Sequence, residues 1–237
     1  MNKKFSIIVC GAGGRVGAKI IERIAKAGQF SLFGAVDIAG GENISSPEEF
    51  ENLIAKADIA IDFTSPKASL RFAKICAKAR KPIVIGTTGF TNEELSDLKN
   101  CANEAPVFLS PNMSPAVNLT FAVSKLIAKK LKNFDISILE AHHIMKKDAP
   151  SGTALRYRDY IMEVSDKKID MASVRAGGII GEHTVLFAGS DERVELTHRA
   201  QSRDVFAKGA LEAAKWTAVQ KPGFYNFFDM FDLKDIV

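Results

Sequence analysis

The densest group of reactive side chains lies in one segment, EAHHIMKKDAPSGTA, at residues 140–154. Two of the chain's 4 histidines, His142 and His143, are adjacent there. Imidazole titrates near neutral pH, so one histidine could deliver a proton while the other binds a carboxylate. Lys146 and Lys147 follow closely and could hold an anionic substrate or stabilise negative charge that develops in a reaction.

The second half of this segment has the composition of a helix start. Ser151 is a candidate N-cap, and the amides of Gly152 and Thr153 at the start of the helix would then offer a site for a carboxylate or phosphate. A metal site is not expected, because adjacent histidines rarely chelate one ion and no third ligand is evident in the sequence. The plainer alternative is an exposed basic loop followed by a capped helix.

A glycine-rich turn follows the first apolar run, residues 5–10. The turn has the sequence GAGGRVG at residues 11–17, and apolar residues at helical spacing continue to residue 27, which predicts strand, turn and helix. A pyrophosphate could approach the backbone of such a turn, where the helix N-terminus favours its charge. The glycine spacing is not the strict dinucleotide pattern, because Val16 takes the last required position and Gly17 follows it.

Asp37 adds to the case for a nucleotide. It follows the second predicted strand, residues 32–36, about 20 residues after the turn, where a carboxylate can accept hydrogen bonds from the adenosine ribose. The alternative is a structural glycine turn followed by an unrelated surface aspartate. Asp37 would repel a 2′-phosphate, and Ile38 stands where an arginine could hold one, although Arg15 could still reach it. We therefore expect NADH and/or NADPH as cofactor, with NADH used at least as well.

Three further predicted strands end in small and polar residues: DFTSP at 62–66, GTTGF at 86–90 and SPNMS at 110–114. In a doubly wound sheet these ends share the rim where a ligand binds. Small residues and hydroxyls at 86–89 would let a flat nicotinamide ring approach the backbone, and Asn112 offers an amide for polar groups. Each segment alone is equally typical of a turn or a helix cap.

Short apolar runs alternate with helical stretches over the first half of the chain, which predicts a parallel sheet covered by helices on both faces. The second half begins with a predicted helix at 118–131 and returns to helical composition at 206–219. Between these lie four runs typical of an antiparallel or mixed sheet: residues 136–139, 169–174, 183–188 and 194–198.

We therefore expect an α/β fold, a Rossmann-type doubly wound parallel sheet with an inserted α+β domain of mixed sheet. Residues 1–113 would form the first part of the dinucleotide-binding domain, and residues 206–237 would return to it. Residues 114–205 would form the inserted domain. The absence of a flexible linker in the sequence favours an insertion of this kind.

Composition argues against several classes of partner. The 32 basic and 28 acidic residues give a net charge of +4, far below that of a typical nucleic-acid-binding protein, so no nucleic acid partner is expected. Cys10, Cys76 and Cys101 fit neither a zinc site nor a disulfide framework and suit a reducing cytosol. No apolar run approaches the roughly 20 residues of a membrane span and no signal-peptide layout is present, so we expect a cytoplasmic protein without a membrane partner.

Together, these motifs closely resemble those of the 4-hydroxy-tetrahydrodipicolinate reductases, formerly called dihydrodipicolinate reductases. The resemblance runs nearly end to end, and its most specific part is the histidine-lysine-PSGTA segment. The matching motifs, in the family's order, are GAGGRVG, DFTSP, GTTGF, PNMSPAVN, EAHHIMKKDAPSGTA, RAGGIIGEHTVLFAG and HRAQSRDVFAKGALEAAKW.

The resemblance implies an NAD(P)H-dependent oxidoreductase of lysine and diaminopimelate biosynthesis. Its substrate would be a cyclic imine dicarboxylate, 4-hydroxy-tetrahydrodipicolinate, which is converted to tetrahydrodipicolinate with loss of water. Members of the family are homotetramers that associate through the sheet of the inserted domain. Residues 114–205 would then both bind the substrate and form the tetramer.

The resemblance also implies roles for individual residues. His142 would be the general acid and Lys146 its catalytic partner. The substrate's carboxylates would be bound by residues of the same segment: His143, Ser151, Gly152 and Thr153. The cofactor would be held by residues of the glycine turn and of three strand ends: Gly11, Ala12, Gly13, Gly14, Arg15, Val16, Asp37, Gly86, Thr87, Thr88, Ser110, Pro111, Asn112 and Met113.

The chain departs from the family's pattern at three positions, none of which removes a reacting group. Val16 replaces the usual methionine, and Met145 stands where a histidine or aromatic residue often precedes the lysine. Ala116 stands where glycine is common and could shift the hinge between the domains, because alanine lacks glycine's backbone freedom. The chain is also short for the family between residues 37 and 62.

Two other functions fit part of the sequence. Another inserted-domain dehydrogenase of the aspartate-derived pathway would share the nucleotide half but would not account for PSGTA. A non-catalytic NAD(P)-binding redox sensor would need the cofactor site without His142 or Lys146, and both residues are present. Arg203 is a weaker candidate for contact with the substrate.

Overall fold

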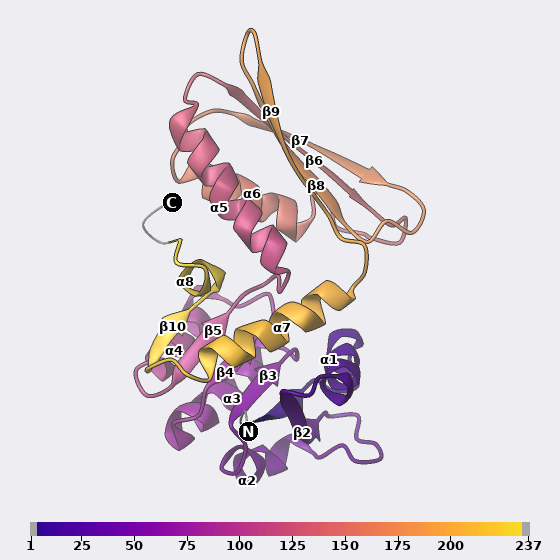
Figure 1. Ribbon diagram of the computed structural model, residues 1–237, viewed down its shortest axis with the longest axis vertical. Helices are drawn as coiled ribbons and strands as arrows, with labels where there is room; N and C mark the ends of the chain where they lie inside the picture. Colours follow the sequence, from indigo (N-terminus) through magenta and orange to yellow (C-terminus); the bar gives the residue numbers. More distant parts are fainter. Residues whose placement is uncertain (1–3, 234–237) are drawn as a thin grey trace. The chain divides into compact units, whose positions relative to one another are not determined.

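The computed structural model describes residues 4–233, which divide into two compact units (Figure 1). Among the described residues, the first unit comprises 4–113 and 204–230, and the second comprises 114–203 and 231–233. The predicted outer limits of the domains, residues 1 and 237, lie outside the described part of the chain. None of the helices within residues 4–233 is long and apolar enough to cross a bilayer.

The first unit is built on a six-stranded parallel sheet with the order β10-β5-β4-β3-β1-β2. Its strands are β1 Phe5–Cys10, β2 Phe30–Val36, β3 Ile59–Asp62, β4 Ile83–Ile85, β5 Pro106–Leu109 and β10 Gly223–Tyr225. Because β1 lies between β2 and β3, the winding direction reverses there, and ligands of such folds bind beyond the carboxyl ends of the strands at that point. The predicted Rossmann-type doubly wound sheet is confirmed.

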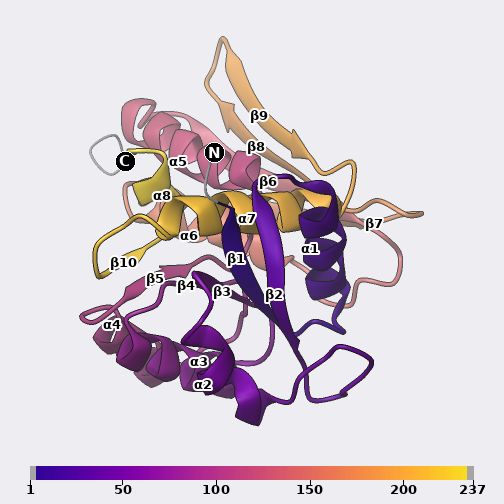
Figure 2. The same cartoon turned by 60° about the horizontal axis from the view of Figure 1, so that its bottom comes forward.

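Helices cover both faces of this sheet (Figure 2). One face carries α1 Arg15–Lys26 and α7 Asp204–Thr217, and the other carries α2 Phe50–Ile54, α3 Pro66–Ala79 and α4 Asn92–Cys101. Two short helices, η1 Pro47–Glu49 and α8 Phe227–Met230, also belong to this unit. Covering both faces explains the continuous apolar strands, since Ile7, Ile8 and Val9 are each 0% exposed. The three cysteines are buried free thiols.

The second unit contains a four-stranded mixed sheet with the order β7-β6-β8-β9. Its strands are β6 Asp135–His142, β7 Ile169–Arg175, β8 Glu182–Ala188 and β9 Arg193–Arg199. β6 runs parallel to β7 and antiparallel to β8, which is antiparallel to β9. Two helices, α5 Pro115–Lys130 and α6 Gly152–Met162, lie on one face of the sheet (Figure 1). The predicted mixed sheet is confirmed.

β6 carries two ionisable side chains on its buried face. Ile136, Ile138, Glu140 and His142 are all buried, whereas Leu139 between them is 45% exposed. The prediction ended this strand at Leu139, which was too early, because β6 continues to pair with β7 and β8. The longer strand places Glu140 and His142 on the same face.

Four short elements were not predicted. η1 and α2 lie in the segment between the second and third strands, and β10 and α8 follow α7. β10 begins at Gly223, which pairs with Pro106 at the edge of the sheet. Such short elements have too few residues to show a periodic pattern in the sequence.

Gly17 in α1 packs directly against the glycine turn. A Cβ at this position would lie 2.1 Å from the carbonyl oxygen of Gly11 and 3.1 Å from the Cα of Ala12. Both neighbours are backbone, so the turn would have to open. Alanine normally stabilises a helix more than glycine does. Here we predict the opposite, that Gly17→Ala lowers the free energy of unfolding by about 1–3 kcal/mol. Urea denaturation measures this change.

Gly28→Ala is the matched control, because a Cβ there would meet nothing within 4 Å. We expect this variant to change the free energy of unfolding by less than about 0.5 kcal/mol. Equal stability of the two variants would contradict the close approach of α1 to the turn.

Candidate functional site

The glycine turn lies at the carboxyl end of β1, where the winding of the sheet reverses. Gly11 has a φ of 79°, and a Cβ there would lie 2.6 Å from the carbonyl oxygen of Phe63, in the loop after β3. The backbones after β1 and β3 therefore touch, and only glycine permits this contact. Of the predicted cofactor residues, six belong to this region: Gly11, Ala12, Gly13, Gly14, Arg15 and Val16.

The backbone amides of this turn already donate hydrogen bonds to acceptors within the protein. Of those at residues 11–14, two donate to the carbonyl oxygen of Val36, one donates to Asp37 and one donates within the turn. The next amides, those of Arg15 and Val16, lie in the first turn of α1, where a helix offers no internal acceptor. A pyrophosphate at this edge would therefore bind the first turn of α1 more directly than the glycines themselves.

Asp37 borders a cavity of about 280 Å³ at the same edge of the sheet. Its carboxylate accepts hydrogen bonds from the amides of Gly13 at 2.9 Å and Ala39 at 3.0 Å. A carboxylate has about four acceptor positions, so it can also accept from a ribose. The apolar part of the lining is Val36, Ile38, Pro47, Phe63, Ala68 and Phe72. Apolar walls beside one carboxylate fit an adenosine, and the small volume fits only part of a dinucleotide.

The loop after β4 contains three predicted cofactor residues. A Cβ on Gly86 would fall 2.2 Å from the ring of Phe63, so glycine is required for this packing. Thr87 is buried and donates its hydroxyl to Asp62 at 3.0 Å, whereas Thr88 is exposed. A ring that approaches this loop would therefore meet the backbone and Thr88, because the hydroxyl of Thr87 is turned into the protein.

The predicted residues after β5 form a short turn. Ser110 donates its hydroxyl to the carbonyl oxygen of Asn112 at 2.8 Å, and Met113 is 2% exposed. Pro111 is exposed and Asn112 is half-buried. A molecule bound here would meet Pro111 and Asn112, while Ser110 and Met113 shape the turn.

Asp62 is fully buried among hydroxyl groups at the end of β3. It accepts hydrogen bonds from the hydroxyls of Thr64 at 2.6 Å, Thr87 at 3.0 Å and Ser69. Burial raises the pKa of Asp62 to about 6, and the hydroxyl groups oppose this rise only in part. Ser69 and Thr87 also contact each other at 2.8 Å, so the two hydroxyls and one Asp62 oxygen form a triangle.

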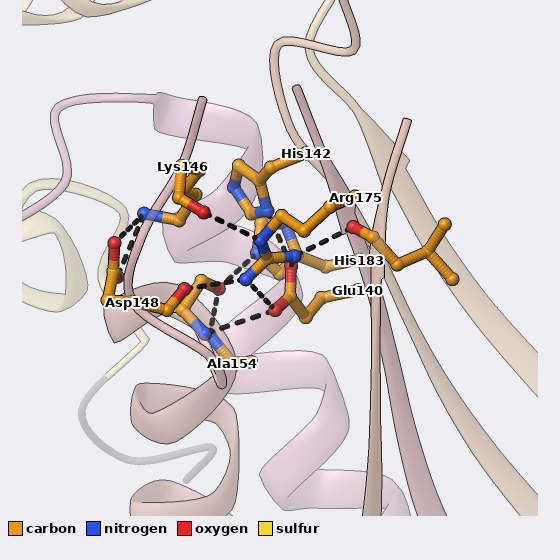
Figure 3. Close-up of polar contacts among 9 residues, drawn as sticks. Glu140, His142, Lys146, Asp148, Ala154, Arg175 and His183 are labelled. Carbon is orange, nitrogen blue, oxygen red and sulfur yellow. Dashed lines mark hydrogen bonds and ion pairs between the residues drawn. The ribbon is translucent and has the colours of Figure 1, made fainter. Parts of the chain in front are cut away.

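In the second unit, the histidine-lysine segment and Arg175 supply the hydrogen-bond partners of a buried carboxylate, Glu140, which is 2% exposed (Figure 3). One oxygen contacts Nδ1 of His142 at 2.5 Å, and the other accepts from the amide of Ser151 at 3.2 Å. Arg175 donates to both oxygens, at 2.9 and 2.7 Å. Burial acts to raise the pKa of Glu140, but hydrogen bonds, first among them those from Arg175, outweigh it and bring the pKa to about 2.

His142 ends β6 and is 8% exposed. Glu140 holds Nδ1, which fixes the ring and leaves Nε2 as the second titrating nitrogen. The ring lies edge-on to His183, with centroids 5.1 Å apart. Burial lowers the pKa of His142 below its usual value, and the hydrogen bond with Glu140 opposes this shift. A bound anion would add negative charge and raise that pKa.

Lys146 and His143 lie in the loop that follows β6. Nζ of Lys146 pairs with both oxygens of Asp148, at 2.8 and 2.9 Å, and this pairing holds the pKa of Asp148 below its usual value. The amide of Lys146 donates to the carbonyl oxygen of His143 at 3.0 Å. Because the side chain of Asp148 is 59% exposed, its ion pair is weak enough for another anion to replace it.

Ser151 is the N-cap of α6, as predicted: its hydroxyl accepts from the amide of Ala154 at 3.2 Å. The same oxygen contacts Nε2 of His183 at 3.1 Å, and Ser151 is 1% exposed. Its hydroxyl thus fixes the start of the helix from inside the protein. Gly152 and Thr153 follow in the first turn, where Gly152 is exposed, so an anion at this terminus would meet their amides.

Sequence reasoning missed three members of this cluster. They are Glu140, which binds His142, and two residues of other strands, Arg175 and His183. Glu140 could have been found, because it precedes His142 by two residues and a strand puts such residues on one face. His183 is 4% exposed, and burial lowers its pKa to about 3. Within residues 4–233, no three His, Cys, Asp or Glu side chains gather as a metal site requires.

Comparison with known proteins shows what the whole chain is similar to. Two family models match it: "Dihydrodipicolinate reductase, N-terminus" over residues 5–113 and "Dihydrodipicolinate reductase, C-terminus" over residues 116–231. The 4-hydroxy-tetrahydrodipicolinate reductase of Aquifex aeolicus is 42% identical, with 96% of this chain and 98% of the relative covered. The enzyme of that name from Citrifermentans bemidjiense is 40% identical, with 96% and 99% covered.

Solved structures share the fold. The dipicolinate-bound dihydrodipicolinate reductase from Paenisporosarcina sp. TG-14 has a TM-score of 0.83 at 24% identity and covers 96% of this chain and 99% of that one. The C. glutamicum DAP dehydrogenase in complex with DAP has a TM-score of 0.61 at 11% identity, with 99% and 96% covered. Both likenesses concern the fold alone, whereas the family models and the relatives separate this chain from other inserted-domain dehydrogenases.

Asp62 makes stability depend on pH. Its pKa in the folded protein is raised to about 6 from 3.8, so between these values the folded state keeps a proton that the unfolded state has released. The stability contributed by the neutral carboxyl is therefore full below about pH 4 and is lost as the pH rises through about 6. Asp62→Asn stays neutral, so we predict that its free energy of unfolding relative to wild type rises by roughly 2–4 kcal/mol between about pH 4 and 7.

Urea denaturation of both proteins at the two pH values measures this difference. Asp166→Asn, at an exposed aspartate, is the matched control and should show no such relative gain. If the stability difference between Asp62→Asn and wild type were the same at both pH values, Asp62 would not be a neutral buried acid.

Proposed function

The chain belongs to the dihydrodipicolinate reductase family, and we propose how its residues carry out that family's reaction. It is a 4-hydroxy-tetrahydrodipicolinate reductase, an NAD(P)H-dependent oxidoreductase of lysine and diaminopimelate biosynthesis. The observation that carries this function is the match of two family models over residues 5–113 and 116–231. Neither these matches nor the relatives support a non-catalytic redox sensor.

The overall reaction adds a hydride and a proton to 4-hydroxy-tetrahydrodipicolinate and releases water, which gives tetrahydrodipicolinate. When bound, the reduced nicotinamide supplies the hydride. The protein therefore has to bind a cyclic dicarboxylate, supply a proton and balance the charge that develops during the reaction.

In this proposal His142 delivers the proton through Nε2, because Glu140 engages Nδ1. The low pKa that burial gives His142 makes its protonated form a stronger acid than an ordinary imidazolium. A dianionic substrate stabilises that protonated form, so His142 takes up its proton as the substrate binds. The proton is then available where it is needed.

Lys146 assists His142 as a nearby cation. In the free protein Lys146 is paired with Asp148, and a substrate carboxylate would take the place of that partner. The amides of Gly152 and Thr153 at the start of α6 would hold a carboxylate, where the helix dipole favours negative charge. His143 would bind a carboxylate as well, and Ser151 would contribute through its cap.

The first unit would hold the cofactor at the glycine turn and the cavity beside Asp37. NADH should serve at least as well as NADPH, because a 2′-phosphate near Asp37 would meet a negative charge. Ile38, which follows Asp37, is 91% exposed and supplies no cation for that phosphate. Arg15, in the first turn of α1, keeps the use of NADPH possible.

A homotetramer formed through the mixed sheet is the assembly that we propose. The face of this sheet opposite Ile138 exposes Leu139 at 45%, and Val174 on β7 is 51% exposed. A neighbouring subunit would cover such large apolar side chains. We also propose a cytoplasmic location, which the free thiols support, and no nucleic acid or membrane partner, in line with a net charge of +4.

Turnover and its loss in two variants test this function. We predict that the protein oxidises NADH when freshly generated 4-hydroxy-tetrahydrodipicolinate is supplied. The decrease in NADH absorbance measures this reaction. His142→Ala and Lys146→Ala should lower kcat by about 10²–10⁴-fold, because each removes a group that acts on the reacting substrate.

Lys168→Ala, at an exposed lysine paired with Asp170, is the control and should keep wild-type kcat. Tight binding of NADH without turnover by the wild-type protein would favour the redox sensor instead. Unchanged kcat in Lys146→Ala would remove Lys146 from the reaction.

Cofactor preference gives a separate test. We predict that kcat/KM with NADH equals or exceeds kcat/KM with NADPH, because the carboxylate of Asp37 repels a 2′-phosphate. Asp37→Asn removes that repulsion and should raise the ratio of NADPH to NADH efficiency. Steady-state kinetics with both cofactors measures these ratios, and a strong NADPH preference in the wild type would overturn the assignment.

A further inference from the structure

Arg175, the last residue of β7, uses its whole guanidinium group. Both of its terminal nitrogens donate to Glu140, at 2.9 and 2.7 Å. The same nitrogens also donate to the carbonyl oxygens of Val174 at 2.7 Å and Asp148 at 2.6 Å, and Nε donates to that of Lys146 at 3.3 Å. A guanidinium has five N–H groups in a fixed fork, and here each has an acceptor.

These contacts join parts of the chain that are far apart in sequence. Figure 3 shows the guanidinium of Arg175 between the carboxylate of Glu140 and the loop that bears Lys146. Arg175 lies opposite His142 in the parallel register of β6 and β7. One side chain therefore fixes both the strand end that carries His142 and the backbone on either side of Lys147, at residues 146 and 148.

Glu140 extends this linkage to the start of α6. Its second oxygen accepts the amide of Ser151, the residue that caps the helix. The carboxylate thus connects Nδ1 of His142, the guanidinium of Arg175 and the proposed anion-binding terminus. If lysine replaced Arg175, its single ammonium group could not form these contacts, and both His142 and the start of α6 would shift.

Four titratable or charged side chains face His142, and each comes from a different element. Glu140 on its own strand favours the protonated imidazole, whereas Arg175 from β7 and Lys146 from the following loop disfavour it. His183 from β8 faces the ring at 5.1 Å, and burial keeps it neutral by lowering its pKa to about 3. Loss of the charge on Arg175 and loss of the charge on Glu140 should therefore move the titration of His142 in opposite directions.

We propose that Arg175 is a positioning residue of the reaction, which through Glu140 orients His142 and through two backbone carbonyls sets the loop that carries Lys146. This proposal rests on the proposed function of His142 and Lys146. A buried ion pair is by itself weak evidence for a role in stability. The guanidinium binds both the strand end that carries His142 and the loop that carries Lys146. Its contacts therefore fit a role in orienting these two residues.

The test compares Arg175→Lys, Arg175→Gln and Glu140→Gln with wild type. Lysine keeps the charge but cannot form the fork, so Arg175→Lys should lower kcat by about 10–100-fold through misplacement of the reacting groups. Its affinity for NADH, measured by fluorescence titration without substrate, should stay within about twofold, because the cofactor residues belong to the first unit. Arg158→Lys, at an arginine of α6 that donates to Asp159 at 2.8 and 3.1 Å, is the matched control and should keep wild-type kcat.

The second readout does not depend on turnover. NMR titration of ring-labelled histidine, with the His142 signal assigned by its loss in His142→Gln, follows the protonation of His142 directly. Arg175→Gln should raise the pKa of His142 and Glu140→Gln should lower it. For a general acid, activity falls as the pH rises through its pKa, so the basic limb of the kcat profile should move up in the first variant and down in the second.

Wild-type kcat in Arg175→Lys, or a His142 titration that moves in the same direction in both neutral variants, would overturn the positioning role. If the Arg175 variants fail to fold, Glu140→Gln decides the question, because an unmoved titration in that variant is equally damaging. If the two variants show these shifts but the wild-type protein has no turnover, the proposed function is refuted and the orientation of His142 by Arg175 and Glu140 stands.

Discussion

A carboxylate that is removed from water must recover its hydrogen bonds inside the protein, and Glu140 is such a group at 2% exposure. Its partners come from the end of β6, from β7 and from the start of α6. Satisfying this one charge therefore requires β6 and β7 to pair with each other in the register that places His142 opposite Arg175. The ordering of His142, of the loop that follows it and of the start of α6 follows from that requirement.

The first unit buries a carboxyl group by a different route. Asp62 is surrounded by hydroxyls from Thr64, Ser69 and Thr87, which donate weaker hydrogen bonds than a guanidinium does. Asp62 is also the more deeply buried of the two, so burial prevails there and its pKa rises to about 6, whereas at Glu140 the guanidinium prevails and the pKa falls to about 2. The hydroxyl network still has a structural use, since it joins the strand ends after β3 and β4 that border the proposed cofactor site.

Local patterns in the sequence were enough to predict the doubly wound sheet, the mixed sheet and the cap at Ser151, because each depends on nearby residues. Glu140 was missed because the apolar pattern of β6 stops at Leu139, although pairing with β7 and β8 carries the strand to His142. Arg175 was missed for a different reason. It is 35 residues from Glu140, and nothing in the sequence states which strand β6 will pair with or in which register.

The inward turn of Thr87 could not be foreseen either, because it depends on a buried acid contributed by another strand. The proposed roles of His142 and Lys146 came from a family resemblance, and the geometry adds a reason for the arrangement of the two residues. In the free protein, burial together with the charges of Arg175 and Lys146 disfavours a protonated His142. The start of α6 adds further positive potential to the same unit.

These surroundings favour the neutral form of His142 until an anion binds. A substrate with two carboxylates would add negative charge beside the ring and so make the protonated imidazole favourable. The proton donor would then be charged mainly when a substrate is present to receive the proton. On this view the surroundings of His142 would couple substrate binding to its protonation, and Arg175 would matter for the electrostatics of His142 as well as for its position.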